Sequence, residues 1–239
     1  MARAAQKAGM TPALAIFVKT PGFSPVKTRL AATIGAAQAT HFHRLAAAAT
    51  AAVARSCRPA LVPYWAVAEI EPAAHRMWSG FAHVWQGEGG LGERLHHVYS
   101  ELQARHGRVL LIGADAPQLT PALLGRALAV LNAGDSPFVL GDAADGGFWL
   151  FGGREPVDRN AWLSVLYSRP DTAMQLRDAL AARGHLGTLP MLADTDDAAD
   201  LPVLIQALAA LPDLLPAQRT LHAWLLAITD ETSLAGVHA

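Results

Sequence analysis

Cysteine is almost absent from this sequence, because Cys57 is the only one in 239 residues. A single cysteine excludes an intrachain disulfide, a cysteine-based zinc cluster and a dithiol redox pair. Cys57 precedes Arg58 and Pro59 and has no neighbouring histidine or aspartate that would mark it as a nucleophile. We therefore expect a cytoplasmic protein whose chemistry does not depend on thiols.

Long apolar runs are missing as well. The alanine-rich segment 45–53 is bounded by Arg44 and Arg55, and no stretch approaches the roughly 20 uncharged apolar residues of a membrane span. Near the N-terminus, the apolar run 13–18 ends at Lys19 and is too short for the core of a signal peptide. These absences predict a soluble chain with no membrane span.

Charge of one sign is not in excess either, since 19 Lys and Arg stand against 20 Asp and Glu and give a formal net charge of -1. A broad basic face is therefore not expected, which argues against nucleic acid as a partner. The sequence also has no Gly-x-Ser-x-Gly elbow, so acyl transfer is not supported. Any cation that acts in a binding site must be a local one.

What the sequence does contain is a regular alternation of short apolar runs and longer helical patterns. We predict one domain over residues 13–228, with residues 1–12 and 229–239 as flexible termini. The predicted strands are 14–18, 64–68, 82–85, 109–112, 138–140, 148–151 and 186–189, and the predicted helices are 36–55, 91–105, 121–132, 172–183 and 201–211. The segment 141–147 is too short for a crossover helix, so the strands beside it should be antiparallel or bent. This order predicts an α/β fold, a three-layer αβα sandwich with a mixed, mostly parallel sheet.

The most informative segment is 109–117, where an apolar run stops at Gly113, Asp115 and Pro117. Such a run is typical of a buried parallel strand and its end. Ligands of open α/β sheets bind outside the carboxyl ends of the strands, so Asp115 would lie at the edge of that crevice as a candidate metal ligand. The alternative role for Asp115 is to cap a turn or the helix that begins near Thr120.

A basic loop follows the first predicted strand. Its cations are Lys19, Lys27 and Arg29. Loop amides, a helix N-terminus and cations together favour anions, and α/β proteins bind nucleotide phosphates after their first strand. The loop is neither a Walker A nor a G-x-G-x-x-G sequence, and a solvated basic loop is the alternative. We predict that these three side chains face the phosphates of a nucleotide.

A glycine-rich segment, 86–95, follows the third predicted strand and opens a helix. Gly90 and Gly92 would let the backbone approach a ligand closely, and Arg94 falls in the first helical turn, where an anion could bridge it to free amides. The alternative is a flexible turn without ligand contact. The segment adds Gly90, Gly92 and Arg94 to the candidate nucleotide-binding residues, together with Asp115.

Further carboxylates follow later strands. Asp145 lies between two strand-like runs, and Asp196 lies in the acidic cluster 194–197. Asp115 and Asp145, at the ends of different strands, suit Mg²⁺ or Mn²⁺ held on a diphosphate by few protein ligands. An acceptor hydroxyl would need a base, for which Asp145 and Asp196 are the candidates. The alternatives are a hairpin turn at Asp145 and a helix cap in the acidic cluster.

Five motifs occur in a fixed order along the chain. They are Phe-Val-Lys-x-Pro with Val-Lys-Thr-Arg-Leu (17–30), Gln-x-x-x-Gly-Leu-Gly-Glu-Arg-Leu (86–95), Ile-Gly-Ala-Asp-Ala-Pro (112–117), Asp-Gly-Gly-Phe-Trp-Leu (145–150) and Leu-Pro-x-Leu-x-Asp-x-Asp (189–196). As a set, over about residues 13–201, they resemble the bacterial DUF2064 family, also called radical-SAM/selenodomain-associated transferase 1. That family is a branch of the glycosyltransferase-A and MobA-like nucleotidyltransferase fold.

The resemblance implies a fold that binds nucleotide-diphosphate sugars together with a divalent cation, Mg²⁺ or Mn²⁺. Asp115 stands where related folds place a metal-binding or ribose-proximal carboxylate. Lys19, Lys27 and Arg29 would then face phosphates.

The leading functional hypothesis is a metal-dependent transferase that uses a nucleotide-sugar donor and an unknown small-molecule acceptor. The alternative is a nucleotidyltransferase, in which a phosphorylated acceptor attacks the α-phosphate of a nucleoside triphosphate while Lys27 and Arg29 stabilise the developing charge. A third hypothesis is a nucleotide-binding protein without catalysis. It rests on departures from the family pattern at Pro25, where glycine is common, and at Ala144, where aspartate is usual.

Overall fold

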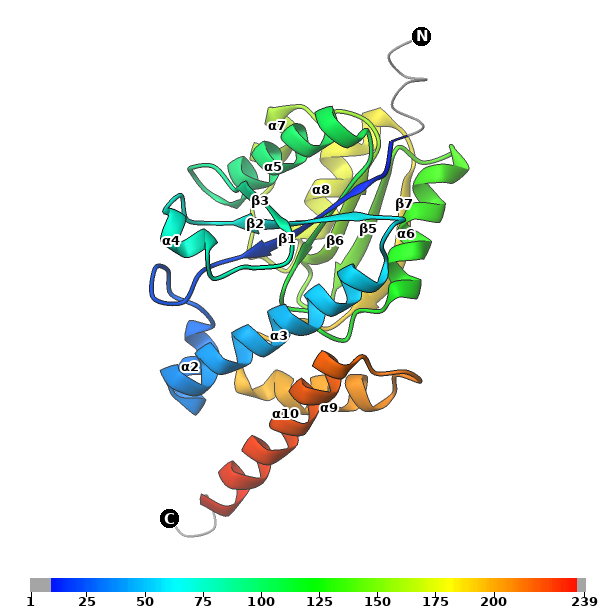
Figure 1. The fold of residues 1–239 in the computed structure, drawn as a ribbon. Helices are drawn as coiled ribbons and strands as arrows, with labels where there is room; N and C mark the ends of the chain where they lie inside the picture. The colour runs from blue at the N-terminus through cyan, green and yellow to red at the C-terminus, as the bar shows by residue number, and fades with distance from the viewer. Residues whose placement is uncertain (1–9, 236–239) are drawn as a thin grey trace.

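Within residues 10–235, the part of the chain that the computed structural model describes, seven strands form one sheet (Figure 1). The strands are β1 (Ala13–Val18), β2 (Val62–Val67), β3 (Ala82–Trp85), β4 (Val109–Gly113), β5 (Phe138–Ala143), β6 (Phe148–Gly153) and β7 (Leu186–Leu192). Their order across the sheet is β3-β2-β1-β4-β6-β5-β7. In this sheet β6 runs antiparallel to both of its neighbours, β4 and β5, while the other pairs are parallel. The prediction of a mixed, mostly parallel sheet is confirmed.

The central strands β1 and β4 are apolar on both faces of the sheet. Along β1, Leu14 and Ile16 belong to the core on one face, whereas Ala13 and Ala15 belong to the core on the other. A strand buried on both faces appears in the sequence as a continuous apolar run, which is why these strands could be predicted. Because β1 pairs in parallel with β2 and β4, the carboxyl ends of these strands meet at one edge of the sheet.

Helices cover both faces of the sheet. They are α2 (Thr28–Ile34), α3 (Ala36–Ser56), α4 (Pro72–His75), α5 (Leu91–His106), α6 (Pro121–Ala133), α7 (Arg159–Leu163), α8 (Thr172–Leu180), α9 (Leu201–Ala209) and α10 (Pro216–Ala235). α3 and α6 share the core on one face, and α5, α7 and α8 share the core on the other. The predicted αβα sandwich is therefore confirmed. The helix predicted over 172–183 is α-helical only to Leu180, and Ala181–Arg183 form a 3-10 turn.

An additional helical layer lies outside α3. α9 and α10 pack against the side of α3 that points away from the sheet (Figure 1). Phe42 of α3, Leu204 of α9 and Leu221 of α10 belong to this outer core, in which all three are almost fully buried. α3 is thus covered on both sides. α10 is not among the predicted elements, although it completes this layer.

Of the termini predicted to be flexible, 1–12 and 229–239, residues 1–9 and 236–239 lie outside the described residues, while 229–235 continue α10 to Ala235. The single domain over 13–228 stays a prediction. No helix between residues 10 and 235 combines the length and the apolar character that crossing a membrane requires.

Candidate functional site

A cavity of about 800 Å³ opens at the carboxyl ends of β1 and β4. Its walls come from the loops after β1, β3 and β4, the turn between β5 and β6, the loop before α8 and the loop after β7. Open α/β sheets bind ligands at this edge. All predicted site residues except Gly92 line the cavity, namely Lys19, Lys27, Arg29, Gly90, Arg94, Asp115, Asp145 and Asp196.

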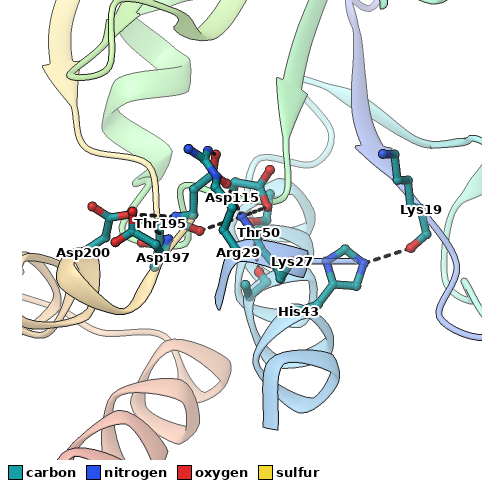
Figure 2. Close-up of polar contacts among 11 residues, drawn as sticks. Lys19, Lys27, Arg29, His43, Thr50, Asp115, Thr195, Asp197 and Asp200 are labelled. Atoms are coloured by element: carbon teal, nitrogen blue, oxygen red, sulfur yellow. Dashed lines mark hydrogen bonds and ion pairs between the residues drawn. The ribbon is translucent and has the colours of Figure 1, made fainter. Parts of the chain in front are cut away.

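Lys27 lies at the centre of the polar contacts in this cavity (Figure 2). Its Nζ is 2.7 Å from Oδ1 of Asp115 and 3.0 Å from Oδ1 of Asp196. The ammonium also donates a hydrogen bond of 2.6 Å to the carbonyl oxygen of Thr195. The Lys27 side chain is only 6% exposed, so its charge is enclosed by these three oxygen atoms.

Two opposing effects act on the pKa of Lys27. Burial lowers the pKa, but the nearby carboxylates of Asp115 and Asp196 outweigh burial and raise it above its ordinary value of 10.5. Lys27 is therefore a permanent cation whose charge the protein itself compensates. The ammonium that was predicted to face a phosphate is engaged by two carboxylates in this structure.

Asp196 is held by two cations. Lys27 contacts its Oδ1, and Nη2 of Arg29 donates a hydrogen bond to its Oδ2. Burial acts to raise the pKa of Asp196, but the charges and hydrogen bonds of Lys27 and Arg29 prevail and lower it. A carboxylate with a lowered pKa is a weak base, so this arrangement does not favour Asp196 as the acceptor base. Helix capping in the acidic cluster falls instead to Asp197, whose Oδ1 accepts the N–H of Ala199 at 2.9 Å.

Lys19 is the cation of the basic loop whose charge is free. It follows β1, its side chain is exposed, and its ammonium has no ion-pair partner among residues 10–235. Its carbonyl oxygen lies 2.9 Å from Nε2 of His43 in α3 (Figure 2). His43 is buried, and burial lowers its pKa, so the neutral ring donates this hydrogen bond from Nε2. The contact fixes the backbone that carries Lys19.

Asp194 is a cavity carboxylate that sequence reasoning did not single out. It lies in the loop after β7, and no cation contacts it among the described residues. Burial first, and then the charges of Asp145 and Asp196, raise the pKa of Asp194 to about 6. The acidic cluster 194–197 was the available signal, but spacing alone does not show which of its members faces the cavity.

The remaining carboxylates decide whether a divalent cation fits this cavity. Among residues 10–235, no three His, Cys, Asp or Glu side chains are grouped as a ready-made cation site. A cation bound together with a diphosphate needs only one or two carboxylates, because phosphate oxygens and water complete its coordination. Asp115 and Asp145 both line the cavity, and Lys27 contacts only Oδ1 of Asp115. The place of both carboxylates in one cavity is compatible with a cation shared with a diphosphate, and that cation site stays a prediction.

Gln86 and Arg94 hold the glycine-rich loop. Nε2 of Gln86 donates to the carbonyl oxygens of Val18 and Ala66, at 3.1 and 2.8 Å, and so ties the loop to the ends of β1 and β2. Nε of Arg94 donates to the carbonyl oxygen of Gly89 at 3.0 Å. Arg94 thus orients the loop and keeps further N–H donors for a ligand in the cavity.

Gly90 and Gly92 have different environments. Gly90 lines the cavity, and its N–H donates to Oε2 of Glu93 at 3.0 Å. Gly92 points elsewhere, because a Cβ added there would lie 2.9 Å from the carbonyl oxygen of Trp162 and 3.0 Å from the ring of Tyr167. Glycine at position 92 therefore permits close packing of α5 against α7. Gly92 does not line the cavity, and its contact with a ligand stays a prediction.

The loop 167–172 forms a further wall and contacts the turn between β5 and β6. Gly146, with φ of +87, is required there, because a Cβ would lie 1.8 Å from the carbonyl oxygen of Pro170. Ser168 and Lys27 are the two non-glycine residues with positive φ among residues 10–235, at 59 and 46, and both line the cavity. Strained backbone is concentrated at functional sites, so this shared location supports the cavity as the functional one.

Comparison with protein families agrees with this geometry. The sequence profile of a family described as "uncharacterized protein conserved in bacteria (DUF2064)" matches residues 33–169. The matched segment includes the glycine-rich loop, Asp115 and Asp145, and it ends before the acidic cluster 194–197. No curated protein sequence matches the chain.

Solved structures share the fold. A proposed nucleotide-diphospho-sugar transferase from Desulfovibrio desulfuricans G20 superposes with a TM-score of 0.82 at 23% identity, over 93% of this chain and 98% of that chain. Rv0371c from Mycobacterium tuberculosis H37Rv superposes with a TM-score of 0.54 at 17% identity, over 82% of this chain and 98% of that chain. Glucosyl-3-phosphoglycerate synthase from Mycobacterium tuberculosis, in complex with Mn²⁺, UDP and phosphoglyceric acid, superposes with a TM-score of 0.50 at 11% identity. The superposition covers 88% of this chain and 82% of that chain. This chain has the fold of nucleotide-diphospho-sugar transferases and belongs to the DUF2064 family.

Proposed function

We propose that this protein is a metal-dependent transferase, acting in the cytoplasm, that moves a sugar from a nucleotide-sugar donor to a small acceptor with a hydroxyl group. The observation that carries the proposal is the composition of the cavity. The free ammonium of Lys19, the guanidinium of Arg94 and the carboxylates of Asp115, Asp145 and Asp194 converge there. Cations offset the charge of a diphosphate, and carboxylates supply cation ligands and a proton acceptor.

The diphosphate would lie against Lys19 and Arg94 rather than against Lys27. Lys19 has no carboxylate partner among the described residues, whereas the charge of Lys27 is already compensated by Asp115 and Asp196. Arg94 lies in the first turn of α5, where free amides of the helix also attract anions. Arg29, two-thirds exposed and paired with Asp196, would contribute only at the rim.

Asp115 and Asp145 would hold a divalent cation, Mg²⁺ or Mn²⁺. When bound, such an ion neutralises the diphosphate that leaves as the bond to the sugar breaks. The chain contributes the orientation of both ligands. Lys27 fixes Oδ1 of Asp115 and leaves Oδ2 uncontacted by its ammonium, and the N–H of Gly147 donates to Oδ1 of Asp145 at 2.8 Å.

Asp194 is a better candidate than Asp196 for accepting the proton of the acceptor hydroxyl. It faces the cavity without a cation partner among residues 10–235, whereas Lys27 and Arg29 neutralise Asp196. Burial, the largest cause, raises the pKa of Asp194, whereas the pKa of Asp196 is lowered, so Asp194 is the stronger base of the two.

Two structural relatives support a transferase of this class. The Desulfovibrio desulfuricans protein is a proposed nucleotide-diphospho-sugar transferase, and the Mycobacterium tuberculosis synthase binds Mn²⁺ and UDP. At identities of 23% and 11%, these relatives support the fold, while the substrates proposed for this chain rest on its own cavity.

Thermal unfolding in the presence of UDP-, GDP-, ADP- and CDP-linked sugars and of nucleoside triphosphates, with and without Mn²⁺, tests the proposal. We expect a saturable, Mn²⁺-dependent rise in Tm with at least one sugar nucleotide, because a ligand that binds only the folded state stabilises it by mass action. The rise should be lost in Lys19→Met and in Asp145→Asn. It should persist in Asp213→Asn, which changes an exposed aspartate outside the cavity. A protein whose Tm no nucleotide changes would contradict the proposal.

The same panel separates the alternatives. A rise confined to triphosphates, followed by release of pyrophosphate, would replace sugar transfer with nucleotidyl transfer. Lys27 and Arg29, which that reaction was predicted to use, are both paired with Asp196 here. Metal-dependent binding without turnover of any donor would favour a nucleotide-binding protein without catalysis.

A further inference from the structure

We propose that a smaller pocket beside the main cavity binds the base of the nucleotide and selects guanine, an inference that rests on the proposed function. This side pocket has a volume of about 410 Å³ and lies among the loops that follow β1, β2 and β3. It shares Ser24, Gly89 and Arg94 with the main cavity, so the two spaces adjoin. A nucleotide whose phosphates contact Arg94 could therefore extend its base into the side pocket.

Large apolar side chains form part of the wall of the side pocket. Phe23 is 46% exposed and Ile70 is 62% exposed. Trp85, at the end of β3, adds a half-buried indole whose ring meets that of His97 edge to face. Grouped, exposed apolar side chains mark binding surfaces, and aromatic faces stack on nucleic-acid bases. These walls therefore suit a flat heterocycle better than a bare cation.

The polar groups of the side pocket are mainly hydrogen-bond acceptors. Glu69 is nearly buried, and both of its carboxylate oxygens accept the N–H of Thr20, at 3.0 and 3.1 Å. Its carboxylate is therefore already hydrogen-bonded within the protein. The carboxylates of Glu71 and Glu88 also line the pocket and have no hydrogen-bond or ion-pair partner among the residues that the structure describes. Arg94 is the one cation among the described lining residues, and it is bound to the carbonyl oxygen of Gly89. The pocket thus offers free acceptors to a ligand.

Free carboxylates discriminate among the four bases by the donors on each base edge. Guanine presents its N1–H and its 2-amino group side by side, so one carboxylate can accept two parallel hydrogen bonds. Adenine and cytosine offer an exocyclic amino group next to an acceptor nitrogen. Uracil offers one N–H between two carbonyl oxygens. These oxygens and a carboxylate are both electron-rich and repel each other. The chemistry of Glu71 and Glu88 therefore favours guanine most and uracil least.

Calorimetric titration of the full chain with GDP, IDP, ADP, CDP and UDP, in the presence of Mn²⁺, tests this inference. We expect GDP to bind at least about tenfold more tightly than UDP, as one bidentate base contact provides. IDP, which lacks the 2-amino group, should bind with intermediate affinity. Glu71→Gln or Glu88→Gln should weaken the binding of GDP about fivefold or more and leave the binding of UDP unchanged. The control is Glu155→Gln, at an exposed residue outside both cavities, which should change the affinity for neither nucleotide.

A separate variant tests the stacking wall. Phe23→Ala should weaken the binding of all five diphosphates, because stacking on an aromatic ring does not depend on the identity of the base. Phe23 is exposed, so its truncation leaves the core intact.

The outcomes distinguish this inference from the proposed function. If the diphosphates bind with equal affinity, or if neither glutamate variant changes the ratio of GDP to UDP affinity, the guanine site is wrong while the transferase proposal stands. If no diphosphate binds and Lys19→Met behaves like wild type, the proposed function itself fails. Loss of Mn²⁺ binding in Glu71→Gln or Glu88→Gln, without a change in base preference, would mark the pocket as a cation site and overturn the inference.

Discussion

Lys27 gives the cavity a positive charge that is part of the chain and, unlike a bound metal ion, cannot leave the site. Its ammonium lies between Asp115 and Asp196 and is almost fully buried. The three charges depend on one another, because removing one member of a buried ionic network leaves the others uncompensated. Lys27 therefore holds the position of Asp115, which lines the cavity.

Replacing Lys27 with methionine should lower the free energy of unfolding by about 1–3 kcal/mol, as measured by urea denaturation. The loss should be smaller than for a fully buried pair, because the Asp115 and Asp196 side chains are 46% and 34% exposed. Saturating Mn²⁺ should recover part of the loss, since a divalent ion can take the place of the ammonium. Arg126→Met, which removes an exposed cation from α6, serves as the control. Wild-type stability in Lys27→Met would show that the network does not stabilise the fold.

His43 should make the stability of the protein depend on pH. Burial lowers its pKa in the folded state, so below the ordinary value of 6.5 the unfolded chain binds more protons, and the free energy of unfolding falls as the pH falls. One pH unit below 6.5, this contribution amounts to at most about 1.4 kcal/mol. His43→Gln keeps an N–H donor for the Lys19 carbonyl and should show a shallower pH dependence in urea denaturation. The exposed His185→Gln should retain the wild-type dependence.

The sequence predicted where the site residues lie better than it predicted which side chains they contact. Lys19, Asp115 and Asp145 follow apolar runs, and such strand ends meet at one edge of a parallel sheet. The pairing of Lys27 with Asp196 could not be predicted, because these residues are 169 positions apart and no local pattern encodes a contact between side chains. The roles of these residues in binding and catalysis stay predictions.

Among the elements, α3 has a double role because it packs against the sheet and against α10. The outer contact depends on Leu221, which is fully buried in the outer core, whereas Leu226 of the same helix is 44% exposed. Leu221→Ala should lower the free energy of unfolding by about 2–5 kcal/mol, through lost burial and a residual cavity. Leu226→Ala is the matched control and should cost less than about 1 kcal/mol. Equal effects of the two substitutions in urea denaturation would show that α10 does not stabilise the fold through this contact.

The sequence predicted long and strongly patterned elements better than short ones. α5 and α6 begin and end within one residue of the predicted helices 91–105 and 121–132. α4 and α7 were missed because four or five residues are too few for a helical period to be recognised. α10 does carry a usable signal, since Leu221, Leu225 and Ile228 recur at helical spacing and are buried.

For the molecule as a whole, alternation of apolar runs and helical patterns was sufficient to predict the fold class. The short connection 141–147 also predicted that the strands beside it are antiparallel or bent, and β6 is antiparallel to both of its neighbours. The outer layer of α9 and α10 was harder to foresee, because the alanine-rich α3 gives little indication that both of its sides are covered.

The contacts of Lys27 also have a kinetic consequence. They join Lys27 to Thr195 and Asp196, which lie 168 and 169 residues further along the chain. Contacts between such distant residues carry a large loop-closure entropy and slow folding, so they are expected to form only after most of the sheet has assembled. During refolding, the capacity to bind a ligand should therefore return late, and secondary structure should recover before it. A fragment that ends before β7 would lack Thr195 and Asp196 and could not rebuild the network, however well its own strands paired.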